Sequence, residues 1–413
     1  MSQPPVIRNL KEFLEPVLDS GTTVLNYRSK FLTVPGDNYG STMLALTVDI
    51  ADANNEPKQL QLVAKMRPTS EEFFDIFQID VTFVKEAAVY SQIIPAMVSL
   101  QREMQFPAEE MIDVFCRCYN TRVSLDPHSI KVDADGVMLF ENLKLAGYIT
   151  ADRRKGFNRA VAGFILKKLS LFHAIPIAMR YLKPNTFEGN VRKHLVKIDI
   201  DAGLKEGAIE RLVDVIHADI IKAGVAEEIV KKLMILIKDC RQRQANLVSD
   251  EVNQFCSILH NDLWVNNIMI RYDDSGKPSG LKLVDFQLIQ LDSLVRDVLF
   301  FLLTSVSDAD LESDMEQYFE LYFGSLRSHL IKLRCPNTSQ FSYQNFLDEI
   351  NCIAPREFYH IVSMLRVVMA KKEFIPEQSE QDSDLFSDDN IVEDDYFDKL
   401  RQVVKVYSKR EWI

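Results

Sequence analysis

The chain has 413 residues, of which 47% are hydrophobic and 26% charged, which suits one two-lobed globular unit or two to three average domains. Its formal net charge of -12 argues against nucleic acid or an anionic membrane as a main partner. The first eight residues lack the apolar core of a secretory signal, and no run approaches the roughly 18 apolar residues of a membrane span, so we expect a cytoplasmic protein.

The N-terminal region predicts a short helix followed by a hairpin. Apolar residues recur on one helical face over residues 7–19, and two strand patterns follow at 30–34 and 42–49. The segment between these strands contains Gly36 and Gly40, which would let backbone N–H groups approach nucleotide phosphates closely. The spacing is not G-x-G-x-x-G, and taken alone it is more typical of an ordinary hairpin turn.

A third strand pattern, over residues 59–66, contains Lys65 in the run Leu-Val-Ala-Lys. This run resembles the strand motif in which a lysine reaches the phosphates of a nucleotide. Such a lysine needs a carboxylate to orient it, and the helical pattern over residues 71–97 offers Glu86 beside its packing face. A surface lysine and a solvated glutamate are the alternatives.

Two further strands, over 114–123 and 137–140, complete a small predicted sheet. Beyond residue 142 the patterns become helical, and the first helix is expected to end just before Pro176. His173, near that end, is expected in the core. One or two long helices follow over 208–248 and would wall an acceptor pocket.

The segment with the clearest chemical signal is an H-x-D-x-x-x-x-N motif formed by His260, Asp262 and Asn267. Two short strand patterns flank a Asp-Asp-Ser-Gly turn directly after it, and Asp285 follows the second strand. Phosphoryl transfer needs a carboxylate that accepts a hydroxyl proton and hard oxygen ligands for magnesium, which this set supplies. A plain hairpin with turn-capping Asp and Asn is the alternative.

The remainder of the chain predicts further helices and one acidic segment. Helical patterns cover residues 298–303, 311–333, 343–350, 355–371 and 400–406. Residues 377–398 carry ten acids and no base, so we expect most of this segment to be solvated or mobile, with part folding back through its aromatic residues. The six cysteines are scattered, which favours free, mostly buried thiols.

The run His260-Asn-Asp-Leu-Trp-Val-Asn-Asn-Ile268, together with Asp285-Phe-Gln287, closely resembles the ecdysteroid kinase-like branch of the choline kinase and aminoglycoside phosphotransferase superfamily. The resemblance extends over most of the chain. It implies an α+β, bilobal protein-kinase-like fold, with a small β-rich N-lobe over residues 1–142 and a large, mostly helical C-lobe over 143–413.

The resemblance also implies ATP and Mg²⁺ as cofactors and assigns roles to individual residues. Asp262 would be the catalytic base, Lys65 would reach the phosphates, and Glu86 would orient it. Asn142 departs from the usual hinge Asp. The remaining implied roles are phosphate binding for Gly36, Asn38, Tyr39, Gly40 and Ser41, adenine binding at the hinge for Glu141, Asn142 and Leu143, magnesium binding for Asn267 and Asp285, and structural support for His260 and Asp297.

The acceptor implied by the resemblance is a small-molecule alcohol, with ecdysteroids or hydroxylated xenobiotics as the leading class. Trp264 could line an apolar acceptor pocket or only pack the loop, and Gln287 could contact the acceptor or only fix the metal site. A choline or ethanolamine-type kinase and a non-catalytic pseudokinase that serves as a binding module are the alternatives. We expect a monomer or weak dimer.

Overall fold

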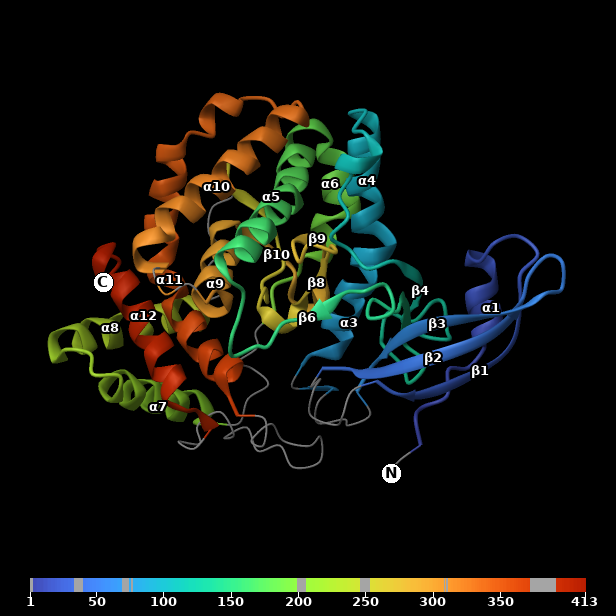
Figure 1. The fold of residues 1–413 in the computed structure, drawn as a ribbon, viewed down its shortest axis with the longest axis horizontal. Helices are drawn as coiled ribbons and strands as arrows, with labels where there is room; N and C mark the ends of the chain where they lie inside the picture. The colour runs from blue at the N-terminus through green and yellow to red at the C-terminus, as the bar shows by residue number, and fades with distance from the viewer. Residues whose placement is uncertain are drawn as a thin grey trace.

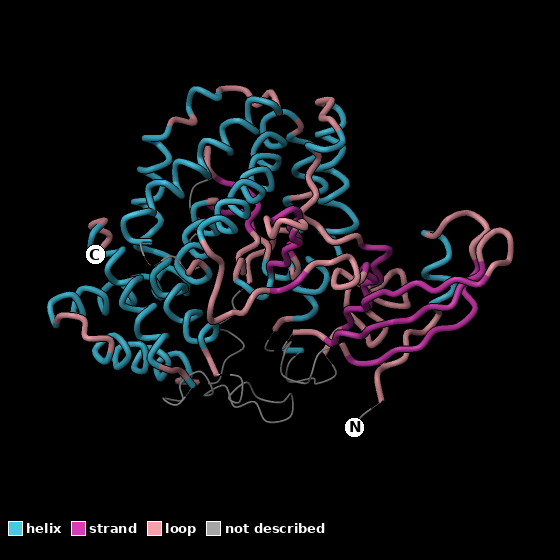
Figure 2. The backbone as a smooth tube through the Cα atoms, viewed as in Figure 1, coloured by secondary structure: helices cyan, strands magenta, loops and turns pink. Residues whose placement is uncertain are grey.

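A computed structural model describes residues 3–32, 40–68, 74–75, 77–198, 206–245, 253–307, 309, 311–371 and 391–413. Its first part is dominated by an antiparallel sheet and its second part by helices (Figure 1). Figure 2 shows the same division, with the long strands gathered on one side and the helices on the other. The arrangement is the predicted one, a β-rich N-terminal region followed by a helical part.

The sheet of the N-terminal region has five strands in the order β1-β2-β3-β5-β4. Along β2, buried residues alternate with half-buried ones, so one face of the sheet packs on a small core that also contains the short helix α1. The predicted strands are present, although β1 begins earlier than expected and β4 is shorter. The bounds are α1 Leu10–Leu14, β1 Thr23–Phe31, β2 Thr42–Ala51, β3 Pro57–Met66, β4 Cys118–Arg122 and β5 Val137–Glu141.

The other face of the sheet is covered by helix α3 (Ile79–Ala88). A π-helical turn, Val89–Ile93, continues it into α4 (Ile94–Glu103), so the helical run extends beyond the predicted end at residue 97. Phe83 and Ala87 of α3 pack against Val63 of β3 in the same core. This packing fixes the height of α3 above the central strand.

Two small sheets connect the lobes. The predicted hairpin is present as β8 (Ile268–Tyr272) and β9 (Pro278–Leu283), and β6 (Ile149–Thr150) pairs with β8. Strands β7 (Cys256–Leu259) and β10 (Gln290–Ser293) form a separate antiparallel pair. The hairpin therefore lies between the large sheet and the helices (Figure 1).

The helical part consists of long apolar helices around one extensive core. Their bounds are α5 Arg159–Leu182, α6 Pro184–Asn190, α7 Ala208–Lys222, α8 Glu227–Ala245, α9 Val295–Ser305, α10 Leu311–Lys332, α11 Tyr343–Met369 and α12 Asp394–Lys409.

Two helix boundaries near prolines were predicted wrongly. Helix α5 continues through Pro176 to Leu182, and α11 continues through Pro355, where a break between two helices was expected. A proline inside a helix costs about 3 kcal/mol, because it removes one backbone hydrogen bond and crowds the preceding turn. Burial of Phe172 and Ile175 in α5 stabilises the fold by about 1.5 to 3 kcal/mol for each side chain. Tertiary packing therefore outweighs the local penalty.

Helix α5 is also long and apolar enough, by length and composition alone, to cross a membrane. This differs from the expectation that no segment would approach that limit. However, 72% of its most apolar window is buried inside the protein. The apolar character of α5 is therefore that of a core helix, packed chiefly against α10.

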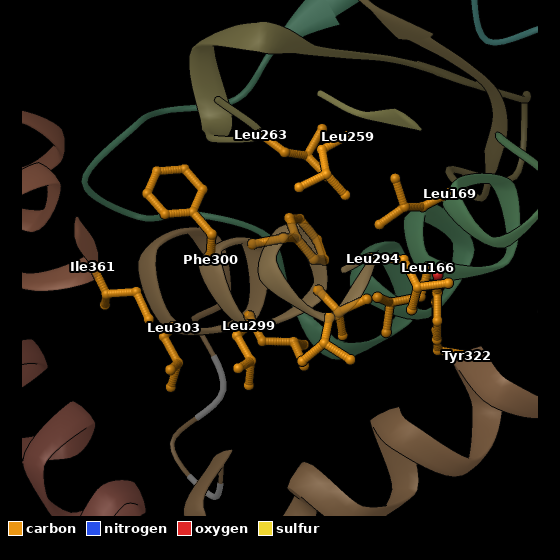
Figure 3. Close-up of a cluster of buried hydrophobic side chains, with 14 of the residues drawn as sticks. Leu166, Leu169, Leu259, Leu263, Leu294, Leu299, Phe300, Leu303, Tyr322 and Ile361 are labelled. Atoms are coloured by element: carbon orange, nitrogen blue, oxygen red, sulfur yellow. The ribbon is translucent and has the colours of Figure 1, made fainter. Parts of the chain in front are cut away.

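The core anchors the segment that carries the predicted catalytic loop. Leu259 and Leu263 are buried on either side of this segment, and Figure 3 shows them above α9, together with side chains of α5, α10 and α11. Because both leucines are fixed in the core, Asn261 and Asp262 between them are held at its surface, whereas His260 is itself buried.

The acidic segment is partly folded into the helical lobe. Residues 377–390 lie outside the described residues, whereas α12 begins at Asp394, six residues earlier than predicted. Tyr396 and Phe397 are buried in the core, as their apolar character indicated. Arg154 pairs with Asp395 over 2.7 Å, so charged residues at the helix start also bind the lobe.

Candidate active site

Lys65 and Glu86 form a buried ion pair. Lys65, in the central strand β3, is 4% exposed, and its Nζ lies 2.5 Å from Glu86 Oε2 and 2.9 Å from Asp285 Oδ1. Burial alone would lower the pKa of Lys65, but the carboxylates of Asp285 and Glu86 outweigh it and raise that pKa. The lysine is therefore a charged ammonium group that joins the small lobe to the end of the hairpin.

Asp285 has a left-handed backbone conformation, with a φ of 67°. This turn lets its carboxylate face Lys65 while the next side chain, Phe286, enters the core. The Phe286 ring lies 6.1 Å from the ring centre of Tyr90 and 4.9 Å from that of His260. Its backbone N–H donates to Glu86 Oε1 over 3.3 Å, so this segment is held from both lobes.

Asp262 and Asn267 are joined directly. The Asn267 amide nitrogen donates to Asp262 Oδ2 over 2.8 Å and to the Asp262 carbonyl oxygen over 2.9 Å. The amide oxygen of Asn267 is then the atom that can face a cation. Burial, followed by the negative charge of Asp285, raises the pKa of Asp262 to about 7. The Asp262 and Asp285 carboxylates therefore belong to one electrostatic centre.

His260 is completely buried, and its Nε2 donates to the carbonyl oxygen of Val284 over 3.0 Å. Burial lowers the pKa of His260, so its imidazole is neutral. Its Nδ1 has no hydrogen-bond partner within the described part of the chain. His260 thus links the loop to the strand that precedes Asp285. Because its imidazole is neutral, it places no positive charge beside Asp262 and Asp285.

Asp297, in the first turn of α9, holds the backbone of the loop. Its carboxylate accepts the N–H groups of His260 over 2.7 Å and Asn261 over 2.9 Å. His173 Nε2 donates to the same carboxylate over 3.2 Å, and His173 Nδ1 lies 2.6 Å from the Tyr322 hydroxyl. Burial would raise the pKa of Asp297, but the bond from His173 and these other contacts lower it. His173 is in the core, as expected.

Two contributors to this arrangement were not predicted. Tyr322 comes from α10, and Gln290 donates from its amide nitrogen to Asn261 Oδ1 over 2.8 Å. Neither lies within a motif, and their partners are distant in sequence, so no local pattern indicated them. Gln290 is close to Asp285 in the sequence, which was the only available signal.

The predicted nucleotide-binding residues are described in part. Gly36, Asn38 and Tyr39 lie outside the described residues, whereas Gly40 and Ser41 lead directly into β2. Their phosphate-binding role stays a prediction.

At the predicted hinge, Glu141 ends β5 and its Oε1 accepts the N–H of Arg117 over 2.8 Å. The carbonyl oxygens of Asn142 and Leu143 accept N–H groups within the following turn, from Leu145 over 3.1 Å and from residue 148 over 3.0 Å. The turn is therefore held by its own hydrogen bonds, and adenine binding there stays a prediction.

The two residues that were predicted as possible contacts of the acceptor substrate have different surroundings. Trp264 is half-buried, packs against the large core, and its backbone N–H donates to the Asp262 carbonyl oxygen over 3.1 Å. Gln287 is only 8% exposed and lies against Gly40 of the small lobe. Contact with an acceptor is untested for either residue.

The donor set fits a nucleotide-bound magnesium ion. Within the described ranges, no group of three or more His, Cys, Asp or Glu side chains could hold a metal by itself. Asn267 and Asp285 instead offer two hard oxygen ligands. Magnesium in nucleotide sites is bound in this way, by one or two protein oxygens together with phosphates and water.

A small antiparallel sheet with a buried Lys–Glu pair, next to a helical lobe that presents Asp262, Asn267 and Asp285, defines a kinase-like fold. A sequence model of the ecdysteroid kinase-like family matches residues 35–335, which is well over half of the chain. The chain belongs to the ecdysteroid kinase-like family. A comparison with curated proteins gave no match.

Proposed function

We propose that this protein transfers the terminal phosphoryl group of ATP to a hydroxyl group of a small molecule, most suitably an ecdysteroid or a hydroxylated xenobiotic. The family is kinase-like, which supports phosphotransferase activity in general. The observation that carries the proposal is the contact of buried Lys65 with both Glu86 and Asp285, together with the effect of the Asp285 charge on Asp262.

Asn267 and Asp285 would hold Mg²⁺. Bound magnesium offsets the negative charge of nucleotide phosphates. Lys65 keeps its positive charge because two carboxylates face it, and it would bind and orient the phosphates. Glu86 would keep Lys65 pointed into the space between the lobes.

Asp262 would orient the acceptor hydroxyl and take its proton. The hydrogen bonds from Asn267 fix the position of the Asp262 carboxylate, which is what a general base requires first. Asp297 would act indirectly, because it holds the backbone on the N-terminal side of Asp262. Half-buried Trp264 would supply apolar surface for a steroid-like acceptor.

The direct test incubates purified protein with ATP, Mg²⁺ and a panel of ecdysteroids, cholines and phenolic glycosides. Mass spectrometry then detects the mass added by one phosphoryl group. The proposal expects a phosphorylated steroid or xenobiotic that D262N does not produce. A phosphorylated choline would instead identify a choline-type kinase.

Nucleotide binding separates an enzyme from a pseudokinase. Isothermal titration with ATP and Mg²⁺ should give binding in both wild type and D262N, since Asp262 faces the acceptor. Binding without any Asp262-dependent turnover across the panel would favour a non-catalytic binding module. Absence of both binding and turnover would contradict the proposed function as a whole.

A further inference from the structure

Gly40 and Gln287 meet at the point where the small lobe approaches the segment that follows Asp285. A Cβ atom at Gly40 would lie 2.9 Å from Gln287 Oε1 and 3.7 Å from its Cδ and Nε2. Real Cβ atoms essentially never show contacts under 3.0 Å, so the amide end of the flexible Gln287 side chain would have to shift. Because Gln287 is only 8% exposed, a shifted amide would have to repack against its neighbours and could not simply turn into solvent.

The backbone of Gln287 is fixed from several directions. On its N-terminal side, Asp285 binds Lys65 over 2.9 Å, and the Phe286 N–H donates to Glu86 over 3.3 Å. The Phe286 ring is completely buried, and residues Phe286–Leu288 form a 3₁₀ turn. Three successive side chains thus point in three different directions. Asp285 faces Lys65, Phe286 enters the core, and Gln287 lies against Gly40.

On the other side of this contact, the strand that follows Gly40 is fixed in the sheet. The chain enters β2 directly after Ser41, where Thr42 pairs with Met66 and Met43 pairs with Lys65. The contact between Gly40 and Gln287 therefore lies within a few residues of the contact between Lys65 and Asp285. Both contacts join the same two segments of the chain.

We propose that Gln287 is a positioning residue that supports the chain at Gly40 and so sets the distance between the start of β2 and Asp285. A glycine is then required at position 40 because the Gln287 side chain packs against it. This reason adds to the one given by the predicted phosphate binding at this residue. The amide gives the necessary length without adding a third negative charge beside Asp262 and Asp285. The consequence for catalysis rests on the proposed function, whereas the contact itself does not.

The catalytic test compares G40A, Q287A and the double variant G40A/Q287A. G40A should raise the KM for ATP about tenfold and leave the KM for the acceptor unchanged, because a displaced β2 start misplaces the nucleotide alone. Q287A in the G40A background should recover most of that loss. G324A is the matched control, since a Cβ at this helical glycine would meet no described atom within 4 Å beyond its own helix backbone and chain neighbours.

A conservative variant separates packing from other roles of Gln287. Q287M keeps an unbranched side chain of similar length, so its KM for ATP should remain within about twofold of wild type, whereas Q287A should raise it. An equal loss in Q287M and Q287A would overturn the packing role.

Thermal unfolding of the nucleotide-free protein tests the contact independently of activity. The Tm loss caused by G40A should be clearly smaller in the Q287A background, which is non-additive behaviour for two residues in contact. Additive Tm losses, or a G40A protein with wild-type Tm and KM, would overturn the inference. If wild type uses no ATP, the proposed function fails, and the unfolding cycle still decides the contact between Gly40 and Gln287.

Discussion

The Lys65 ammonium group donates a hydrogen bond to the Asp285 carboxylate over 2.9 Å, although 220 positions separate the two residues in the sequence. This bond joins the central strand of the small lobe to the end of the hairpin. The Asp285 side chain is 33% exposed, whereas that of Lys65 is 5% exposed. The pair therefore lies at the boundary between the protein interior and the space between the lobes.

Replacing Lys65 with methionine should strongly slow phosphoryl transfer from the nucleotide. K65M removes the cation between Glu86 and Asp285, and the loss of one such group from a preorganised site lowers kcat by about 10²- to 10³-fold. It should also lower the Tm, because the buried Glu86 carboxylate loses its partner. K58M is the control, since Lys58 lies on the same strand with an exposed side chain. Unchanged turnover in K65M would contradict the assigned role.

Replacing Asp262 with asparagine should remove turnover and keep the fold. The amide oxygen of D262N can still accept the bond from Asn267, but it cannot take a proton, so we expect kcat to fall about 10²- to 10⁴-fold. Steady-state kinetics with any acceptor found in the panel measures this change. D274N, at an exposed turn of the hairpin, should match wild type. Equal losses in both variants would point to a general effect on the hairpin.

Replacing Asp297 with asparagine should destabilise the protein and slow catalysis together. The buried carboxylate accepts two backbone N–H groups and one imidazole N–H, and an amide can satisfy only some of them. We expect the free energy of unfolding in urea to fall by about 3 kcal/mol, the upper end of the range for hydrogen bonds to a charged group. The exposed substitution D348N should change it by less than about 0.5 kcal/mol. A stable D297N with normal kcat would exclude a bracing role.

Glu357 predicts a defined pH dependence of stability. Burial by itself would raise its pKa, but the Arg296 guanidinium and the His360 imidazole outweigh burial and lower that pKa to about 2, from 4.5. A lowered carboxyl pKa stabilises the fold above the unfolded value, and this contribution is lost as the pH falls from about 4.5 towards 2. E357Q should therefore cost about 3 kcal/mol at about pH 7.

Urea unfolding of wild type and E357Q at about pH 7, 5 and 4 checks this expectation. The difference in unfolding free energy should stay constant between the first two values and shrink by about 1 kcal/mol at the third. E320Q, at an exposed position of α10, is the control and should show no such trend. A penalty that grows on acidification would show that the sign is wrong.

The C-terminal helix should contribute measurably to stability. Tyr396 donates from its hydroxyl to Asp219 Oδ2 over 2.8 Å, and both residues are buried with Arg366, which pairs with the same carboxylate. Y396F should lower the free energy of unfolding by about 1 to 2 kcal/mol, because Asp219 keeps Arg366 but loses one buried bond. Y272F, at an exposed tyrosine, should have little effect in the same denaturation experiment. Equal stability of the two variants would exclude this contact as a source of stability.

Local sequence patterns determined the elements that depend on neighbouring residues. The alternation in β2, the turn chemistry of the β8–β9 hairpin and the spacing of Asp262 and Asn267 are all short-range features, because a strand, a turn or a loop is built from residues close in sequence. The local patterns of Lys65 and Glu86 alone favoured a surface lysine and a solvated glutamate, and only the downstream motif of Asp262 and Asn267 indicated them as a pair.

Tertiary packing decided what no short segment contains. Helix α5 passes through Pro176 because burial on all sides outweighs a local penalty of about 3 kcal/mol. Tyr322 contacts His173, and Gln287 contacts Gly40, only because segments 149 and 247 positions apart are folded together. Sequence periodicity reports which face of an element is apolar, whereas the partner of each buried polar group depends on where the other elements pack, and only the folded chain specifies that.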